Sequence, residues 1–344
     1  MKILVTGTEG YIGCRLAPYL MARGYDVVGL DTGFYRDGWM YSDPQVAAVP
    51  LTLVKDLRRL AAGDLAGFDA VVHLAELSND PLGQNNPEVT FAINHRGSAN
   101  LAAQAKAAGV RRFVYTSSCS VYGLGSGEFL DETSPVNPQT AYAHCKVRVE
   151  RDVKPMADND YCVTFLRNAT AYGPSPRMRF DIVLNDLCAR ARTTKVITMT
   201  SDGTPWRPIV HVEDICQAIW RTLEAPADAV NGEIFNVGGT SENYRIRDIA
   251  AIVAEAFPGC EVTVGPAGGD NRSYRVRCDK IAERLPGFRC AWDARRGAEE
   301  LARLFERIEF DEHTYTFRAF TRLKQLHYLM KTGQLDQDLF WMEP

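Results

Sequence analysis

The feature that most constrains the fold of this chain is a glycine-rich turn directly after its first apolar segment. Residues 2–6 are β-branched or apolar, which is typical of a buried parallel strand. A helical pattern occupies residues 15–23. Between strand and helix, Gly7 permits a tight turn, Gly10 lets backbone approach a pyrophosphate, and Gly13 lets the helix pack on the strand. The helix N-terminus offers free N–H groups to phosphate. The sequence therefore predicts a dinucleotide site.

An acidic residue ends the next predicted strand and indicates which dinucleotide binds. Residues 25–31 read as this strand, and Asp31 follows the glycines at the distance where a carboxylate binds both ribose hydroxyls. A 2′-phosphate about 4 Å from Asp31 would be repelled by about 1 to 4 kcal/mol per charge. This favours NAD over NADP, although Arg36 is near enough in sequence to accept a phosphate.

Further strand and helix patterns extend this start into a Rossmann-type doubly wound parallel sheet. A short strand is expected to return to that sheet late in the chain, and two helices are expected to flank the later strands. Ligands of such sheets bind at the carboxyl ends of the strands, where Asp56 is placed to meet an adenine amino group. The expected strands are residues 49–53, 68–75, 111–118, 161–167 and 233–238, and the helices are 88–108 and 140–154.

Tyr142 and Lys146 stand four positions apart in the second of these helices, so their side chains share one face. An ammonium beside a phenol stabilises the phenolate. A tyrosine in this state takes a proton from a sugar hydroxyl while a hydride leaves the same carbon. Ser118 ends the strand before this helix and adds a second hydroxyl. Taken alone the pair is a common spacing, and the glycine turn and Ser118 are what make it a candidate catalytic site.

Composition excludes several other classes of protein. A formal charge of −4 and a pI near 5.9 give no attraction to nucleic acid or anionic membrane. No apolar run is long enough to span a membrane. The nine cysteines contain no Cys-x-x-Cys pair, which argues against a zinc site or a disulfide framework and favours a reducing cytoplasm. We expect no metal.

Several ordered motifs resemble those of one known family. With the Tyr142/Lys146 pair, they make the chain similar to the extended short-chain dehydrogenases/reductases, in the nucleotide-sugar branch of the NAD-dependent epimerase/dehydratase family. The resemblance runs from Met1 to about Pro286. The motifs are TGTEGYIG at 6–13, HLA at 73–75, TSSCSVYG at 116–123, YAHCK at 142–146, LRNATAYGP at 166–174 and DGTPWRPIVHVED at 202–214.

The resemblance implies a role for each matching residue. It makes Ser118, Tyr142 and Lys146 the catalytic set. It implies that NAD is held by Gly7, Gly10, Tyr11, Ile12, Gly13, Asp31, Asp56, Leu57, Leu74, Ala75, Asn94, Tyr142 and Lys146. It implies that the nucleotide-diphosphate sugar is contacted by Ser118, Cys119, Ser120, Thr170, Arg179, Asn185, Arg207 and Arg272.

Departures from the family pattern limit which reaction follows oxidation. Similar 4,6-dehydratases carry an Asp-Glu pair where this chain has Cys119 and Ser120, so dehydration by that mechanism is disfavoured. Similar 3,5-epimerases carry a cysteine one position later than Cys119, and one step along a strand turns a side chain to the other face. A structural role is therefore favoured for Cys119. Similar 4-epimerases have asparagine at Thr170 and an arginine where residues 267–270 read AGGD, for which Arg272 is a candidate replacement.

We expect an NAD-dependent epimerase of a nucleotide-activated sugar that oxidises C4 to a 4-keto sugar and returns the hydride to the opposite face. The same residues would also serve a 4-ketoreductase, a dehydratase or a decarboxylase. An alternative of another class is a non-catalytic NAD-binding sensor. The base and the sugar stay open.

The chain is expected to form two intimate domains. The NAD-binding domain takes residues 1–170 with 208–238, and a smaller mixed α/β domain for the nucleotide sugar takes 171–207 and 239–344. Residues 301–330 have helical periodicity, and residues 309–344 match nothing in the family pattern, so they cap the substrate domain or contact a second subunit. By family analogy, helices 88–108 and 140–154 would form a homodimer.

Overall fold

The computed structural model describes residues 1–43, 46, 48–78, 86–266 and 272–342. The stretch 267–270, where similar 4-epimerases carry an arginine, lies outside these residues.

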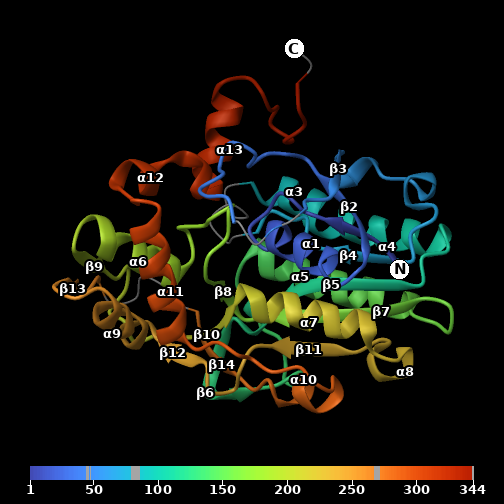
Figure 1. Ribbon diagram of the computed structural model, residues 1–344. Coiled ribbons are helices and arrows are strands. Elements are labelled where there is room, and N and C mark those ends of the chain that lie inside the picture. The colour runs from blue at the N-terminus through green and yellow to red at the C-terminus, as the bar shows by residue number, and fades with distance from the viewer. Residues whose placement is uncertain (44–45, 47, 79–85, 267–271, 343–344) are drawn as a thin grey trace.

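A seven-stranded parallel sheet forms the centre of the molecule (Figure 1). β1 lies between β2 and β4, so the chain winds outward from β1 in both directions. This is the doubly wound arrangement predicted, and the crevice beside β1 is where such sheets bind ligands. In spatial order the strands are β11 (Ile234–Val237), β7 (Cys162–Asn168), β5 (Arg112–Ser118), β4 (Ala70–His73), β1 (Lys2–Thr6), β2 (Asp26–Asp31) and β3 (Leu51–Val54).

Helices cover both faces of the sheet. Because strand side chains alternate, Leu4 of β1 packs on one face while Ile3 and Val5 pack on the other. Helices α4 (Ser98–Ala107) and α5 (Ala141–Val153) cover the face of Leu4, and helices α1 (Gly13–Met21) and α7 (Val212–Glu224) cover the opposite face. Strands buried on both sides account for the near-continuous apolar runs in the sequence.

The helix expected over residues 88–108 is interrupted. It begins as α3 (Pro87–Thr90), continues as a π-helical segment over Phe91–Gly97, and ends as α4. A Cβ at Gly97 would lie 2.2 Å from the Cδ1 atom of Leu57, so glycine permits the close approach of these two segments. The π-helical turn brings Ile93 to the cavity described below.

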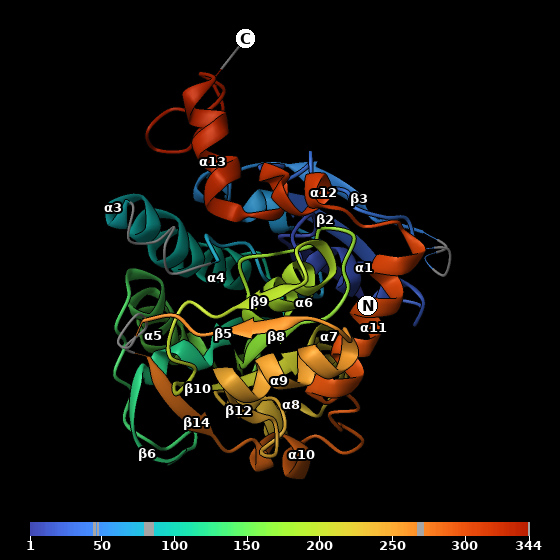
Figure 2. The same cartoon turned by 90° about the vertical axis from the view of Figure 1, so that its left-hand side faces the viewer.

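A second group of elements, the outer unit, has its own apolar core (Figure 2). It contains the three-stranded sheet β8 (Thr170–Tyr172), β10 (Trp206–His211) and β12 (Asn243–Arg245), and helices α6 (Val183–Thr193), α9 (Ile246–Ala256) and α11 (Ala294–Arg307). Two short strand pairs border it: β9 (Val196–Thr198) with β13 (Glu261–Thr263), and β6 (Leu124–Leu130) with β14 (Ser273–Val276). Helices α8 (Ala227–Val230) and α10 (Asp279–Arg284) pack instead against the central sheet, at β7 and β11.

The last helical region is broken and crosses back to the central sheet. Instead of one helix over 301–330, the chain forms the end of α11, then α12 (Glu312–Thr316) and α13 (Arg322–Lys331). Leu326 and Leu329 of α13 join the core that contains Leu4 and Phe34. Both views show α13 beside the β2–β3 side of the sheet (Figures 1 and 2). Residues 322–341 therefore pack against the dinucleotide-binding half.

Candidate active site

A cavity of about 490 Å³ lies between the carboxyl edge of the central sheet and the outer unit. It gathers most residues that the sequence singled out, from segments spread over the whole chain. Those on its wall are Gly7, Gly10, Tyr11, Ile12, Gly13, Asp31, Asp56, Leu57, Leu74, Ala75, Ser118, Ser120, Tyr142, Lys146, Thr170, Arg179, Arg207 and Arg272.

The glycine turn has no room for a side chain at Gly7 or Gly13. Gly7 has φ +78°, and a Cβ there would lie 2.9 Å from the backbone nitrogen of Ala75. A Cβ on Gly13 would lie only 2.0 Å from the carbonyl oxygen of Gly7. The turn therefore brings bare backbone to the N-terminus of α1, and this cradle fits the diphosphate of a dinucleotide.

The two acids at the adenosine end are held by local hydrogen bonds. Asp31 accepts N–H bonds from Glu9 (3.0 Å) and Gly33 (2.8 Å). Burial raises the pKa of Asp31, and these two bonds oppose that rise. The Asp56 carboxylate is paired with Arg58 at 2.6 Å. Both side chains still reach the cavity wall, and Asp31 ends β2 where a ribose would lie.

Helix α5 presents Tyr142 and Lys146 to the cavity from its first turns. Thr140 fixes the start of the helix by accepting a hydrogen bond from the Ala143 N–H (3.2 Å). The Lys146 ammonium is buried 5.3 Å from the centre of the Tyr142 ring and donates to the Thr116 carbonyl. An ammonium so placed stabilises a phenolate.

Two hydroxyls continue this wall beyond Tyr142. Ser118 accepts a hydrogen bond from the Ser120 N–H at 3.1 Å, which orients its oxygen at the end of β5. The Ser120 hydroxyl is buried, lines the cavity and has no hydrogen-bond partner among the described residues. A buried polar group of this kind is satisfied when a polar ligand enters.

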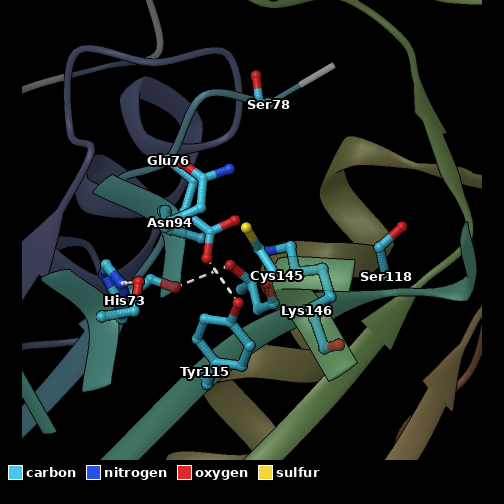
Figure 3. A network of polar contacts seen from close by, with 12 residues as sticks. His73, Glu76, Ser78, Asn94, Tyr115, Ser118, Cys145 and Lys146 are labelled. Carbon is cyan, nitrogen blue, oxygen red and sulfur yellow. Dashed lines mark hydrogen bonds and ion pairs between the residues drawn. The ribbon is translucent and has the colours of Figure 1, made fainter. Parts of the chain in front are cut away.

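Glu76, which the sequence analysis missed, lies at the centre of a polar network with Tyr115 and Lys146 (Figure 3). Its Oε2 atom is 2.7 Å from the Lys146 Nζ atom, and its Oε1 atom accepts the Tyr115 hydroxyl proton at 2.5 Å. Burial alone would lower the pKa of Lys146, but the adjacent Glu76 carboxylate outweighs it and the pKa is raised. The only feature of the sequence that could have indicated Glu76 is its position directly after a predicted buried strand.

His73 anchors the end of β4, three residues before Glu76. Its two ring nitrogens are hydrogen-bonded to the Thr6 hydroxyl (2.6 Å) and the Ser98 hydroxyl (2.7 Å). Burial, with the nearby Lys146 charge, lowers the pKa of His73 to about 3. The ring is therefore neutral at working pH and fixes β4 against β1 and α4.

Three residues expected to contact ligand lie away from the cavity wall. Asn94 is buried and holds both backbone groups of Leu77, with bonds of 2.8 and 2.9 Å. Asn185 is buried and binds the Gly173 N–H and the Arg179 carbonyl. The backbone uses the amide groups of both asparagines, and their contact with ligand stays a prediction.

Cys119 is the third residue that was expected to contact ligand and that lies away from the cavity wall. Its thiol donates to the Arg167 carbonyl at 3.1 Å and packs with Val121 and Tyr122. Burial raises the pKa of this thiol far above its ordinary value. Its contact with substrate stays a prediction, and the structural role favoured by strand alternation fits its position.

Arginines surround the cavity at both ends. Arg179 binds the Asp181 carboxylate at 2.8 Å and donates to the Ser78 hydroxyl at 3.2 Å, which connects the outer unit to the loop after β4. Arg207 donates to the carbonyl groups of Trp206 and Arg272, so these two arginines lie side by side on the outer wall. A positive wall of this kind suits a diphosphate.

The described residues contain no cluster of His, Cys, Asp and Glu that would hold a metal ion. His211, at the start of α7, is buried, binds Glu300 at 2.9 Å and stacks on Trp292. Within the same residues, no helix combines the length and apolar character needed to cross a membrane.

Comparison with known proteins agrees with this geometry. Residues 3–238 match the family described as "NAD dependent epimerase/dehydratase family". The chain belongs to this family. The match covers the glycine turn, Ser118, Tyr142 and Lys146, and its members use NAD, whose diphosphate and ribose fit the cradle at Gly7–Gly13 and Asp31.

Its relatives carry out several reactions on nucleotide sugars. A UDP-glucose 4-epimerase of Mycolicibacterium smegmatis is 32% identical over 295 residues, covering 83% of this chain and 92% of the relative. A UDP-N-acetyl-alpha-D-glucosaminuronate decarboxylase of Bacillus cytotoxicus is 27% identical over 256 residues, covering 72% and 78%. The solved structure of MoeE5 in complex with UDP-glucuronic acid and NAD matches with a TM-score of 0.76 and 28% identity, covering 89% of this chain and 99% of that one. The chain is thus an NAD-dependent enzyme of nucleotide-sugar metabolism.

Proposed function

We propose that this protein is an epimerase that inverts C4 of a nucleotide-activated sugar. NAD, when bound, supplies reversible acceptance of a hydride from the sugar carbon. Tyr142 takes the proton of the 4-hydroxyl and later returns it, and Ser118 holds the same oxygen. Lys146 stabilises the phenolate. Arg207 and Arg272 bind the diphosphate of the substrate, while Ser120 and Thr170 contact its sugar.

The observation that carries this proposal is the state of the acids on the described cavity wall. A dehydratase needs a carboxylate free to act as acid or base beside the sugar. Here each acid is already engaged by a cation or by backbone N–H groups: Asp31 by Glu9 and Gly33, Asp56 by Arg58, Glu76 by Lys146, Asp181 by Arg179 and Asp186 by Arg190. Residues 119 and 120, where similar dehydratases have acids, are Cys119 and Ser120. These contacts favour proton transfer at a single hydroxyl over dehydration.

The test is to incubate the purified protein with UDP-, dTDP- and GDP-sugars and follow products by mass spectrometry and NMR. Epimerisation gives an isomer of unchanged mass without net consumption of NAD. Loss of water would identify a dehydratase, and oxidation of added NADH in proportion to product would identify a ketoreductase. Identifying nucleotide sugars that co-purify with the protein would select the base and sugar for this panel.

A decarboxylase is the second candidate, because one relative is named for that reaction on a UDP-sugar acid and MoeE5 was solved with UDP-glucuronic acid. Release of carbon dioxide from UDP-glucuronate would select it. Tight NAD binding without turnover of any sugar would instead indicate a sensor.

We also propose that the protein acts in the cytoplasm as a homodimer. All nine cysteines are free thiols, as expected in a reducing compartment. Helices α4 and α5 lie next to each other on one face of the sheet and would pair with the same helices of a second copy. Light scattering of the purified protein tests the dimer.

A further inference from the structure

Arg322, the first residue of α13, carries a buried positive charge that the protein does not neutralise. It is 2% exposed and lines the cavity. Its guanidinium lies 4.1 Å from the centre of the Tyr35 ring, and its hydrogen bonds to the carbonyls of Ala319 (3.3 Å) and Arg177 (3.4 Å) are long. No carboxylate of the described residues forms an ion pair with it. A buried guanidinium without a counter-ion is unfavourable unless a ligand supplies one.

The neighbouring arginines already have their own acids. Arg177 is 3.5 Å from the Glu9 carboxylate, and Arg179 is 2.8 Å from Asp181. Each of these acids therefore has a guanidinium partner other than Arg322. Burial lowers the pKa of Arg322, and repulsion from Arg179 lowers it further. An anionic ligand would supply the counter-ion that the buried Arg322 guanidinium lacks.

The position of Arg322 identifies the anion. It donates a hydrogen bond to the backbone carbonyl of Arg177, whose side chain reaches Glu9 inside the glycine turn. The glycine turn and the start of α1 are where the diphosphate of a dinucleotide binds. Arg207 and Arg272, which we propose bind the substrate, come instead from β10 and from the residue before β14.

We infer that Arg322 binds the diphosphate of NAD, so that the C-terminal segment completes the cofactor site. This residue lies outside the family match, which ends at 238. The inference goes beyond the proposed reaction and holds whichever sugar is the substrate. A charge-assisted bond is worth about 1.5–3 kcal/mol, which corresponds to roughly 10- to 150-fold in affinity.

The experiment measures NAD affinity of cofactor-free protein by calorimetry. Arg322→Met is expected to raise the Kd for NAD and for ADP-ribose by about 10- to 100-fold, with the Kd for UDP unchanged. Arg322→Lys, which keeps the charge, should recover part of the loss. The melting temperature of the cofactor-free Arg322→Met protein should not fall, because an uncompensated buried charge is removed.

A matched control separates charge from packing. Leu326→Ala removes a fully buried side chain of α13 but keeps Arg322, so it should lower the melting temperature and leave the Kd for NAD nearly unchanged. Wild-type NAD affinity in Arg322→Met overturns the inference. An equal loss of NAD affinity in Leu326→Ala also overturns it, because Arg322 would then act only through packing. A loss of affinity for UDP instead of NAD overturns it as well, because the partner of Arg322 would then be the substrate.

Discussion

Glu76 and Lys146 form an ion pair of 2.7 Å that is buried almost completely, with side-chain exposures of 3% and 4%. The carboxylate comes from the end of β4 and the ammonium from α5. Lys146 therefore contacts Glu76 as well as facing Tyr142, and the charge that acts on the phenol depends on a residue outside the recognised motif.

Replacing this carboxylate should change the pH dependence of turnover. Glu76 raises the pKa of Lys146 against the effect of burial, so in Glu76→Gln burial is opposed less and the ammonium loses its proton at lower pH. The alkaline limb of the pH–rate profile should then move to lower pH. Tyr115→Phe, which removes the other bond to Glu76 but keeps the ion pair, should move the limb less. Superimposable profiles for wild type and Glu76→Gln would refute this role.

Tyr142→Phe tests the proposed proton transfer. Loss of a general acid/base should reduce turnover by about 10²–10⁴ while the Kd for NAD changes little. Steady-state kinetics and calorimetry on the same preparation measure both. Tyr244→Phe, which removes a hydroxyl bound to Glu242 in the outer unit, should keep the wild-type rate. A Tyr142→Phe enzyme of near-normal turnover would assign the proton to another group.

Gly13→Ala tests the crowding of the glycine turn. The added Cβ would meet the Gly7 carbonyl oxygen at 2.0 Å and the Thr8 Cα atom at 2.7 Å, and both are backbone atoms. Overpacking of this kind costs about 1–3 kcal/mol of folding free energy, and NAD binding should weaken as the turn moves. Urea denaturation and calorimetry measure the two effects. Gly63→Ala, where nothing lies within 4 Å, is the matched control and should change neither.

Cys119→Ser should keep nearly the wild-type rate, because the thiol is buried away from the cavity and the hydroxyl preserves its bond to the Arg167 carbonyl. Burial raises the pKa of this thiol, so iodoacetamide should also fail to label it in the folded protein. Initial rates and mass spectrometry of labelled peptides give both results. A loss of activity comparable to that of Tyr142→Phe would instead make Cys119 an acid or base.

The fold could be predicted because its signals are local. The glycine spacing, the β-branched strands and the pattern of residues 140–154 each depend on neighbours in sequence. The break of the 88–108 helix was missed, because the π-helical turn reflects packing of Gly97 on Leu57 rather than a local preference. The helical periodicity of residues 301–330 likewise could not show where packing on the outer unit ends and packing on the central sheet begins.

Sequence alone could place a residue on the cavity wall where its type and its position at a strand end are enough to indicate a role. Asn94 and Asn185 fit their motifs, but whether an amide faces ligand or backbone depends on the fold around it, and both face backbone. Glu76 was missed for the converse reason. Its partner Lys146 is far along the chain, and only the adjacency of β4 and α5 at the cavity gives the acid a meaning.

The packing of the last segment also bears on how the chain is made. One continuous core contains Leu4 and Leu30 together with Leu335 and Leu339. Leu4 emerges from the ribosome early and Leu339 late, so the packing of this core cannot be completed while the rest of the sheet is being synthesised. Until then its apolar side chains face solvent, and the nascent protein offers a binding surface to chaperones.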